Sequence, residues 1–323
     1  NYAMLNDKEN IDVIDGVGSF ASENSVLVTT PSGEKKIIEG DFIIINSGSK
    51  EADTPFEVIS SNVFSSQTLL DLKNLPKHFV IIGSGFIGIE FASMFANFGS
   101  KVTIVGRSKL LKNEDDDIAN SVKEALRVQG VEILEGCEIE CIKENVLIFK
   151  QNGEQRCLRA DAFLIALGRV ANVDDLNLKA AGVELNEKGF IKTNENLQTN
   201  VPNIYAVGDV RGGELFTYTS LDDFRIVYSQ IFGDKKRNTK NRSIHANVLF
   251  TDTPLARVGM SAKEASKFGL NFKELKLSMA TVPGAKVLNH DVGMLKAIVD
   301  AQSGEILGAS FHCIYANELI NEI

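Results

Sequence analysis

The stretch Phe79-Val80-Ile81-Ile82-Gly83-Ser84-Gly85-Phe86-Ile87-Gly88 decides how this chain folds. Its first four residues are apolar and mostly β-branched, which is typical of a buried strand. The apolar residues Phe91, Met94, Phe95 and Phe98 then recur at helical spacing. The pattern therefore predicts a strand, a tight glycine turn and a helix in direct succession.

A second strand is predicted at residues 102–105, after Gly99 ends the helix. Strand, helix and strand in this order indicate a βαβ unit of a parallel sheet. A further amphipathic helix is predicted over 118–128 and a further buried strand over 162–166. The fold class that follows is α/β.

The glycine loop suits a dinucleotide. Gly83 permits the tight turn, Gly85 lets the backbone approach a pyrophosphate, and Gly88 lets the helix pack closely on the strand. The helix N-terminus adds free N–H groups and a positive dipole end. The candidate site residues are Gly83, Ser84, Gly85, Phe86, Ile87 and Gly88. A glycine-rich turn without a ligand is the alternative.

The end of the second strand selects the nucleotide. An acidic residue there would bind the ribose 2′-hydroxyl of NAD, but the sequence continues Val105-Gly106-Arg107-Ser108-Lys109. Arg107 can bind a 2′-phosphate through two hydrogen bonds, with Ser108 beside it. This favours NADPH, with NADH still possible. An ordinary exposed loop is the alternative.

Two further strand ends carry a glycine followed by a charged residue. They are Gly168-Arg169 and Gly208-Asp209. In open α/β sheets, ligands bind at the carboxyl ends of strands. A carboxylate such as Asp209 can accept hydrogen bonds from the hydroxyls of a polyol. Together with the glycine loop, these ends indicate a second nucleotide site.

Composition narrows the functional classes. Lys and Arg number 34 and Asp and Glu number 43, giving a net charge of −9. This disfavours nucleic acid and anionic membranes as partners. No apolar stretch reaches the roughly 18 residues of a membrane-spanning helix. We expect a cytoplasmic protein, because four cysteines in 323 residues suit a reducing compartment.

Cys137 and Cys141 form the one close pair of cysteines in the sequence. Residues 137–142 alternate like a strand, so the two thiols are predicted on the same face, too far apart for a disulfide. No resident metal site is expected.

These motifs together resemble the class I pyridine nucleotide–disulfide oxidoreductases, such as dihydrolipoamide dehydrogenase, glutathione reductase and mercuric reductase. Residues 83–90 are similar to their NAD(P) loop, 166–169 to their domain-junction motif and 199–209 to their second FAD motif. Residues 45–49 are similar to their FAD-side segment, with Ser for Thr.

A subgroup is also indicated. Residues 216–225 and 254–260 are similar to the bacterial reactive-chlorine-resistance flavoproteins, which are related to mercuric reductase. The strand-end residues 105–108 are more similar to mercuric reductase itself.

The resemblance implies two three-layer, Rossmann-like nucleotide-binding domains, one for FAD and one for NAD(P), plus a partial α+β dimerisation domain. Residues 1–74 and 169–240 are expected in the FAD-binding domain, 75–168 in the NAD(P)-binding domain and 241–323 in the incomplete interface domain.

The resemblance also implies roles for particular residues. Glu90 is expected on the nicotinamide side as a catalytic acid, and Gly168 beside NADP. The residues implied for FAD are Ser47, Gly48, Arg169, Gly208, Asp209, Phe216 and Thr217.

The implied reaction is electron transfer from NADPH to FAD, to a cysteine pair and to an acceptor, in a homodimer. The candidate acceptors are hypothiocyanous acid, copper(II) and mercury(II), which would indicate oxidant or metal stress defence, while organic disulfides and quinones stay open. The family's first FAD loop, its Cys-x4-Cys pair and its terminal His-Glu pair are not among the 323 residues, so we expect either a longer protein that carries them or a fragment that lacks them. His245, His290 and His312 do not match the terminal pair and are expected to be structural or exposed.

Two alternatives stay open at this point. One is an NADH-linked dihydrolipoamide dehydrogenase. The other is a non-catalytic fragment that binds NADP(H).

Overall fold

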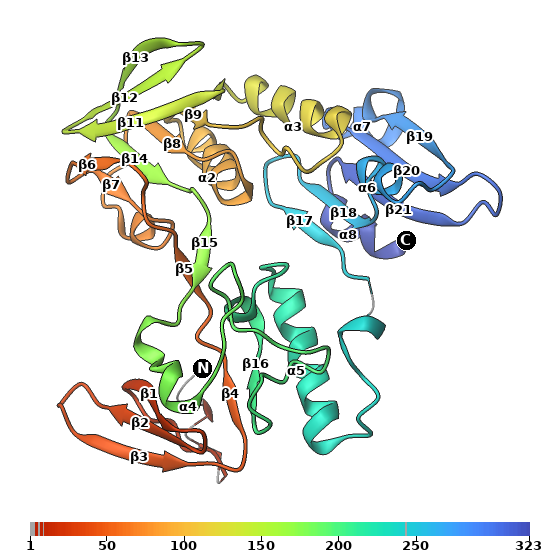
Figure 1. Cartoon of the computed structure of the whole chain (residues 1–323). Helices are drawn as coiled ribbons and strands as arrows, with labels where there is room; N and C mark the ends of the chain where they lie inside the picture. Colours follow the sequence, from red (N-terminus) through yellow and green to blue (C-terminus); the bar gives the residue numbers. More distant parts are fainter. Residues whose placement is uncertain (1–3, 6, 9, 243) are drawn as a thin grey trace. The chain divides into compact units, whose positions relative to one another are not determined.

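The computed structural model describes residues 4–5, 7–8, 10–242 and 244–323, and these form two compact units (Figure 1). Unit 1 comprises 1–50 and 169–243, and unit 2 comprises 51–168 and 244–323. The structural division therefore falls at 50/51, 168/169 and 243/244. The limits of the FAD-binding, NAD(P)-binding and interface domains given in the sequence analysis stay a prediction.

Unit 1 contains a three-stranded antiparallel sheet and a parallel pair of strands. The sheet has the order β1-β2-β3, and β4 pairs with β16 so that Ile45 lies opposite Ala206. Both residues are buried in a small apolar core. The helices and strands of this unit, with β5 crossing its limit at residue 50, are β1 Val17–Ser22, β2 Ser25–Thr29, β3 Lys35–Glu39, β4 Ile43–Ile45, β5 Ser49–Glu51, β15 Arg169–Ala171, α4 Leu178–Ala181, β16 Ile204–Ala206 and α5 Thr217–Phe232.

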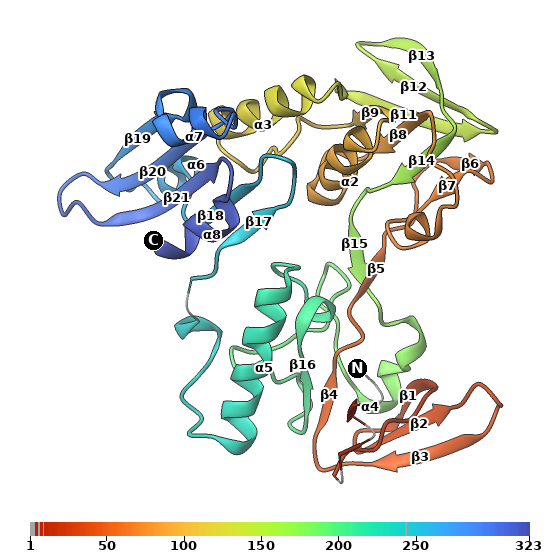
Figure 2. The same cartoon turned by 180° about the vertical axis from the view of Figure 1, so that it is seen from behind.

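The five-stranded sheet that carries the predicted glycine loop in unit 2 has the strand order β10-β9-β8-β14-β7, and all of its pairings are parallel. The predicted βαβ unit is confirmed as β8, α2 and β9, and α2 lies beside β8 and β9 (Figure 2). Helix α3 begins two residues before the predicted start. The bounds are β7 Val63–Phe64, β8 His78–Ile82, α2 Phe86–Asn97, β9 Lys101–Gly106, α3 Asp116–Val128, β10 Glu132–Glu135 and β14 Ala162–Ile165.

Burial explains why these elements form. The β8 residues Phe79 to Ile82 are at most 1% exposed, because both faces of the strand are covered. Ile89, Ala92 and Phe95 of α2 are buried in the same core as Phe79 and Ile81, whereas Val80 and Ile82 belong to a second core. The apolar run of β8 thus contributes to two cores, and α2 packs in one of them.

A second sheet of unit 2 corrects the expectation for the cysteines. It has the order β13-β12-β11-β6, with β6 Glu57–Ile59, β11 Cys137–Lys143, β12 Val146–Gln151 and β13 Glu154–Arg159. The register shifts between Ile139 and Cys141, so Ile139 pairs with Phe149 but Cys141 pairs with its neighbour Ile148. This β-bulge turns Cys141 to the opposite face from Cys137, and the same-face prediction is wrong.

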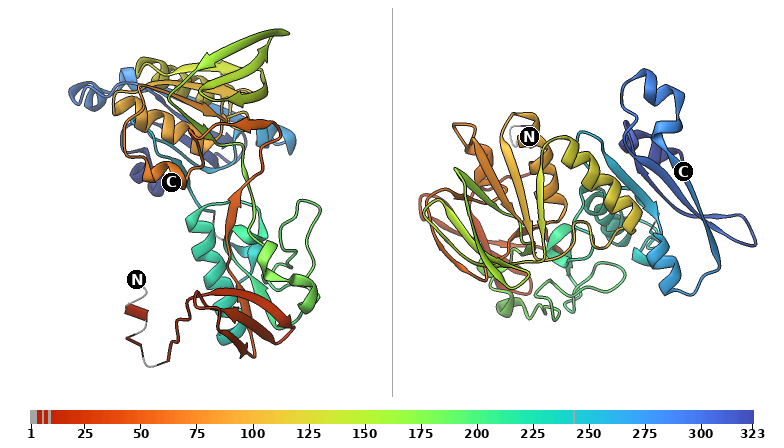
Figure 3. Two further views of the ribbon diagram at one scale, coloured as in Figure 1. Left: turned by 90° about the vertical axis from the view of Figure 1, so that its left-hand side faces the viewer. Right: turned by 90° about the horizontal axis from the view of Figure 1, so that it is seen from above.

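Residues 244–323 form an antiparallel sheet with the order β17-β18-β21-β20-β19 and short helices (Figure 3). The bounds are β17 Asn247–Leu249, β18 Leu255–Gly259, α6 Ala262–Lys267, β19 Phe272–Ser278, α7 Pro283–Val287, β20 Met294–Asp300, β21 Ile306–His312 and α8 Ala316–Leu319. The 3-10 helices of the described residues are η1 Thr68–Asp71, η2 Asp174–Leu176, η3 Gly208–Arg211, η4 Thr239–Asn241, η5 Met279–Thr281 and η6 Ile320–Glu322. No helix within the described ranges is long and apolar enough to cross a membrane.

His312 should make stability depend on pH. It is fully buried in β21, with its Nδ1 2.7 Å from Ser121 Oγ of α3. Burial lowers its pKa to about 4 from an ordinary 6.5. The unfolded chain therefore takes up the proton first, so the contribution of His312 is complete above pH 6.5 and is lost as the pH falls toward 4.

We expect this group to remove about 2 kcal/mol from the free energy of unfolding between pH 7 and pH 5. Urea unfolding at the two pH values measures it. His312→Asn should respond less to pH, whereas the exposed control His290→Asn should respond like the wild type. Equal pH responses of wild type and His312→Asn would contradict the prediction.

Candidate functional site

The glycine loop follows β8 and opens α2, as the sequence predicts. Gly83 has φ +136°, and a Cβ there would lie 2.1 Å from the carbonyl oxygen of Ala166. A Cβ on Gly88 would lie 2.5 Å from the carbonyl oxygen of Gly83. These two glycines are therefore required by the packing of the loop. Around Gly85 no atom lies within 4 Å of a Cβ position, which leaves its backbone open to a ligand.

Alanine substitutions should separate these two roles. Gly83→Ala is expected to lower the free energy of unfolding by roughly 3 kcal/mol, because it combines a clash with a left-handed φ. Gly85→Ala is expected to fold with wild-type stability, since Gly85 has φ −92° and free space, yet to weaken nucleotide binding. Urea unfolding and a nucleotide titration of both variants measure this. Equal stability losses in the two would contradict it.

The start of α2 is available to an anion. Gly85 is its N-cap, and among the described residues no side chain caps the helix. Ser84 Oγ donates to the carbonyl oxygen of Ser108 at 3.4 Å, and the N–H of Leu111 donates to the carbonyl oxygen of Ser84 at 3.4 Å. The glycine loop and the loop after β9 are thus in direct contact.

The end of β9 has no room for an acidic side chain. A Cβ on Gly106 would lie 2.9 Å from both Cβ and Oγ of Ser84. Arg107 follows on the surface, and within the described residues its guanidinium has no hydrogen-bond or ion-pair partner. Arg107 is thus available for an anionic ligand, and Ser108 lies next to it.

Glu90 lies in the second turn of α2 and is partly buried. Burial raises its pKa above the ordinary value, although the N–H of Phe250 donates to its Oε1 at 2.9 Å and opposes this. Phe250 follows β17, 160 residues further along the chain. The carboxyl group is therefore held in one position by the region that follows residue 244.

The second group of predicted residues lies in unit 1, at the carboxyl ends of β4 and β16. Because these strands are adjacent and parallel, Ser47 and Gly48 end one strand where Gly208 and Asp209 end the other. Gly208 has φ +69°, the left-handed conformation that favours glycine. The predicted flavin-side segments are therefore brought to one edge.

Ser49 connects this edge to Arg169. Its hydroxyl donates to Asp209 Oδ2 at 2.6 Å and accepts from Arg169 Nε at 2.6 Å. The Arg169 guanidinium also donates to the carbonyl oxygen of Ser49 at 2.6 Å. Asp209 and Arg169 are thus oriented through one serine, which belongs to the predicted FAD-side segment 45–49 but was given no role of its own. Gly168, the residue before Arg169, lies in unit 2, where its carbonyl oxygen accepts from Ala52 N–H at 3.1 Å.

Two polar atoms at this edge fit an additional group. Ser47 Oγ is buried and has no hydrogen-bond partner among the described residues. Of the two carboxylate oxygens of Asp209, Oδ2 accepts a hydrogen bond from Ser49, whereas Oδ1 accepts none from the described residues. A buried hydroxyl without a partner is costly, so a ligand with polar groups would be stabilised here.

A buried cluster of ion pairs is hydrogen-bonded to the backbone of the turn at Gly208. Asp223 is fully buried; its Oδ2 accepts from the N–H of Gly208 at 2.8 Å and from Arg211 Nε at 2.6 Å. Asp222 is equally buried and pairs with Arg237 and with Arg242, whose Nε lies 2.9 Å from Asp222 Oδ2. Charged pairs at this depth fix geometry more than they add stability.

Phe216 and Thr217 lie at the start of α5, as its N-cap and first residue. The side chain of Thr217 is exposed. These two residues share the helix that carries Asp222 and Asp223.

Comparison with known proteins decides the family. Residues 1–230 match the profile described as "Pyridine nucleotide-disulphide oxidoreductase", and residues 245–323 match the dimerisation domain of the same family. The chain belongs to the pyridine nucleotide-disulphide oxidoreductase family. Membership confirms the expected fold and the expected enzyme class, a flavoprotein oxidoreductase that uses a pyridine nucleotide.

The chain is similar in sequence to several kinds of oxidoreductase within this family. The chain is 43% identical to the probable pyridine nucleotide-disulfide oxidoreductase RclA of Escherichia coli, covering 99% of this chain and 73% of RclA. It is 32% identical to mercuric reductase of Staphylococcus aureus, covering 58% of that protein. It is 33% identical to a dihydrolipoyl dehydrogenase of Bacillus subtilis, covering 69% of it.

Solved structures agree with the sequence relatives. The copper(II) complex of the HOCl-induced flavoprotein disulfide reductase RclA from E. coli superposes with a TM-score of 0.93 at 42% identity, covering 99% of this chain and 73% of RclA. A second RclA structure has a TM-score of 0.92 and 41% identity, covering 99% of this chain and 74% of that chain. The chain thus has the fold of family members over nearly its whole length, and spans about three quarters of RclA and just over half of the mercuric reductase.

Proposed function

We propose that this chain is the nucleotide-binding and dimerisation part of an NADPH-dependent flavoprotein disulfide reductase. The observation that carries the proposal is the end of β9. A side chain at Gly106 would place its Cβ 2.9 Å from Ser84, and the guanidinium of Arg107, which has no partner within the described residues, follows directly in the sequence. A cation at this position suits a 2′-phosphate, which NADPH has and NADH lacks.

The residues of unit 2 that would hold NADPH are those of the glycine loop, with Arg107, Ser108 and Gly168. The open backbone at Gly85 and the uncapped start of α2 suit the pyrophosphate. Glu90 is proposed on the nicotinamide side, where burial raises the pKa of its carboxyl group and the bond from Phe250 N–H holds this group in a fixed position.

The residues of unit 1 that would hold FAD are Ser47, Gly48, Arg169, Gly208 and Asp209, with Phe216 and Thr217 at the start of α5. Asp209 would accept hydroxyl hydrogen bonds of the ribityl chain, since Ser49 already orients it through Oδ2. When bound, NADPH supplies a hydride and FAD supplies a two-electron carrier. The protein residues bind and orient these groups.

The acceptor is proposed from the names of the relatives. RclA is described as HOCl-induced and was solved as a copper(II) complex, and other relatives are mercuric reductases. We therefore propose oxidant or metal defence, with hypothiocyanous acid, copper(II) or mercury(II) as acceptor. The match to a dimerisation domain supports a homodimer, and we propose a cytoplasmic location.

An anaerobic titration of the whole flavoprotein tests the proposal. NADPH should bleach the flavin absorbance at lower concentration than NADH, and an added acceptor should restore the absorbance. Lipoamide belongs among the acceptors tested, because dihydrolipoyl dehydrogenases are also relatives. Preference for NADH together with rapid turnover of lipoamide would contradict the proposal. A protein that binds NADPH but shows no flavin reduction would be a non-catalytic binding module.

A further inference from the structure

We propose that Lys263, in α6 of the dimerisation region, is a positioning residue for the loop that binds the nucleotide. This loop comprises residues 107–114, from Arg107 at the end of β9 to the residue before the N-cap of α3. The inference rests on the proposed function, because this loop is there assigned to select NADPH. It adds a residue of a different domain to the determinants of nucleotide affinity.

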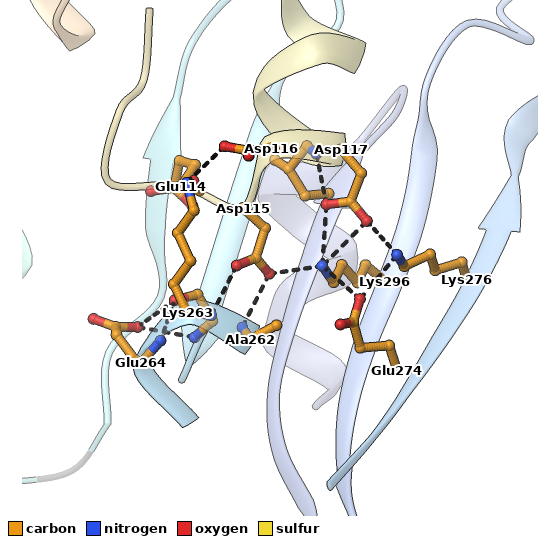
Figure 4. A network of polar contacts seen from close by, with 12 residues as sticks. Glu114, Asp115, Asp116, Asp117, Ala262, Lys263, Glu264, Glu274, Lys276 and Lys296 are labelled. Atoms are coloured by element: carbon orange, nitrogen blue, oxygen red, sulfur yellow. Dashed lines mark hydrogen bonds and ion pairs between the residues drawn. The ribbon is translucent and has the colours of Figure 1, made fainter. Parts of the chain in front are cut away.

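The ammonium group of Lys263 is bonded to the backbone of this loop (Figure 4). It donates to the carbonyl oxygen of Glu114 and, at 3.4 Å, to that of Lys112. It also pairs with Asp116 Oδ1 at 2.8 Å. Backbone carbonyl contacts fix the path of the chain, which an ion pair between two side chains would not do.

A second set of hydrogen bonds joins α6 to the end of the loop, and here the backbone N–H groups of α6 donate and a side chain at the start of α3 accepts. The Asp115 carboxylate accepts from the N–H groups of Ala262 and Lys263, both at 3.0 Å. It also pairs with the buried ammonium of Lys296 at 2.7 Å. Burial raises the pKa of Asp115, but these bonds outweigh it and hold the pKa below its ordinary value. The end of the loop is therefore anchored on the dimerisation region.

Backbone hydrogen bonds connect this anchored end of the loop to the glycine loop. The N–H of Glu114 donates to the carbonyl oxygen of Leu111 at 2.9 Å, and the N–H of Leu111 donates to that of Ser84. Leu111 has φ +50°, a left-handed conformation that a leucine adopts only where its surroundings impose it. A shift of the Glu114 backbone would therefore displace Leu111 and, through it, Ser84 and Ser108.

Apolar packing holds only part of the loop on the side facing α3, where Leu110 and Leu111 are buried in the core that includes Ile118 and Val122 of this helix. A cavity of about 430 Å³ lies there, lined by loop residues from Ser108 to Lys112, by Asp116 and Lys123, and by Lys263 itself. Beside this cavity, polar contacts hold the loop in addition to the packing of Leu110 and Leu111. Lys263 provides two of these polar contacts.

The test compares Lys263→Met with the matched control Lys276→Met in the whole flavoprotein. Lys276 pairs with Asp117 Oδ2 at 2.6 Å and Glu274 Oε2 at 2.8 Å, in the same cluster, but contacts no carbonyl group of the loop. The two lysine side chains are 43% and 46% exposed. Both variants thus lose a comparably exposed ion pair, and only one releases the loop.

We expect Lys263→Met to raise KM for NADPH about fivefold while kcat stays within about twofold, as for a lost hydrogen bond to a charged group. Lys276→Met should leave both constants within about twofold of the wild type. Lys263→Arg should restore most of the affinity, since a guanidinium can reach the same carbonyl groups. Amide hydrogen exchange should rise in residues 107–114 of Lys263→Met alone.

Equal changes of KM in Lys263→Met and Lys276→Met would overturn the inference, as would a fall in kcat without a change in KM. If Lys263→Met does not fold, Lys263→Gln takes its place, because its shorter side chain cannot reach both carbonyl groups. If the wild type prefers NADH, the proposed NADPH selection fails, and Lys263 is judged on KM for NADH by the same comparison.

Discussion

Replacing Arg107 by Glu is expected to reverse the nucleotide preference, lowering kcat/KM for NADPH by about 100-fold while changing that for NADH much less. A guanidinium bonded to a phosphate contributes about 1.5–3 kcal/mol, and the introduced carboxylate adds repulsion. The Arg107 side chain has no partner within the described residues, so its loss should not destabilise the fold. Steady-state kinetics with both nucleotides measures the effect.

The control for this prediction is Lys101→Glu. Lys101 is exposed at the opposite end of the same strand, β9, and the substitution changes the net charge by the same amount. It should leave the preference unchanged, which separates a local contact from a general electrostatic effect. If Arg107→Glu still prefers NADPH to the wild-type extent, Arg107 does not select the nucleotide.

Replacing Asp209 by Ala is expected to weaken flavin binding by about 100-fold, so that the purified variant loses most of its flavin on gel filtration. The substitution removes the carboxylate proposed for the ribityl hydroxyls, which would form charge-assisted hydrogen bonds. It also leaves Ser49 Oγ without its acceptor, and Ser49 orients Arg169. The ratio of flavin absorbance to protein absorbance measures the loss.

Asp174→Ala is the matched control for Asp209→Ala. Asp174 belongs to the same unit and pairs with Lys50 at the surface. It should retain flavin like the wild type, and both variants should show similar thermal unfolding of the flavin-free protein. Full flavin retention by Asp209→Ala would remove Asp209 from the proposed FAD site.

The sequence predicted the parts of the fold that depend on local pattern. The apolar run before Gly83 became the buried strand β8, and the helical spacing after it became α2. The strand-end glycines at 168 and 208 both adopt positive φ. Such features are predictable because a buried strand or a tight turn imposes its requirement on adjacent residues.

Long-range polar contacts were not predictable in this way. Nothing in the sequence joins Glu90 to Phe250, or Lys263 to the carbonyl oxygen of Glu114. The bulge that turns Cys141 away from Cys137 depends on its pairing with β12. Ser49 belongs to the predicted FAD-side segment 45–49, but only the structure shows that it bonds to Asp209.

The contact between Gly106 and Ser84 also constrains how this protein can change during evolution. An acidic residue at 106, the usual route to NAD preference, would place its Cβ 2.9 Å from the side chain of Ser84. Such a substitution therefore requires the segment around Ser84 to shift, and we expect it to be non-additive with a replacement of Ser84. Position 107 is exposed and has no partner within the described residues, so a change of nucleotide preference through this position would leave the contact undisturbed.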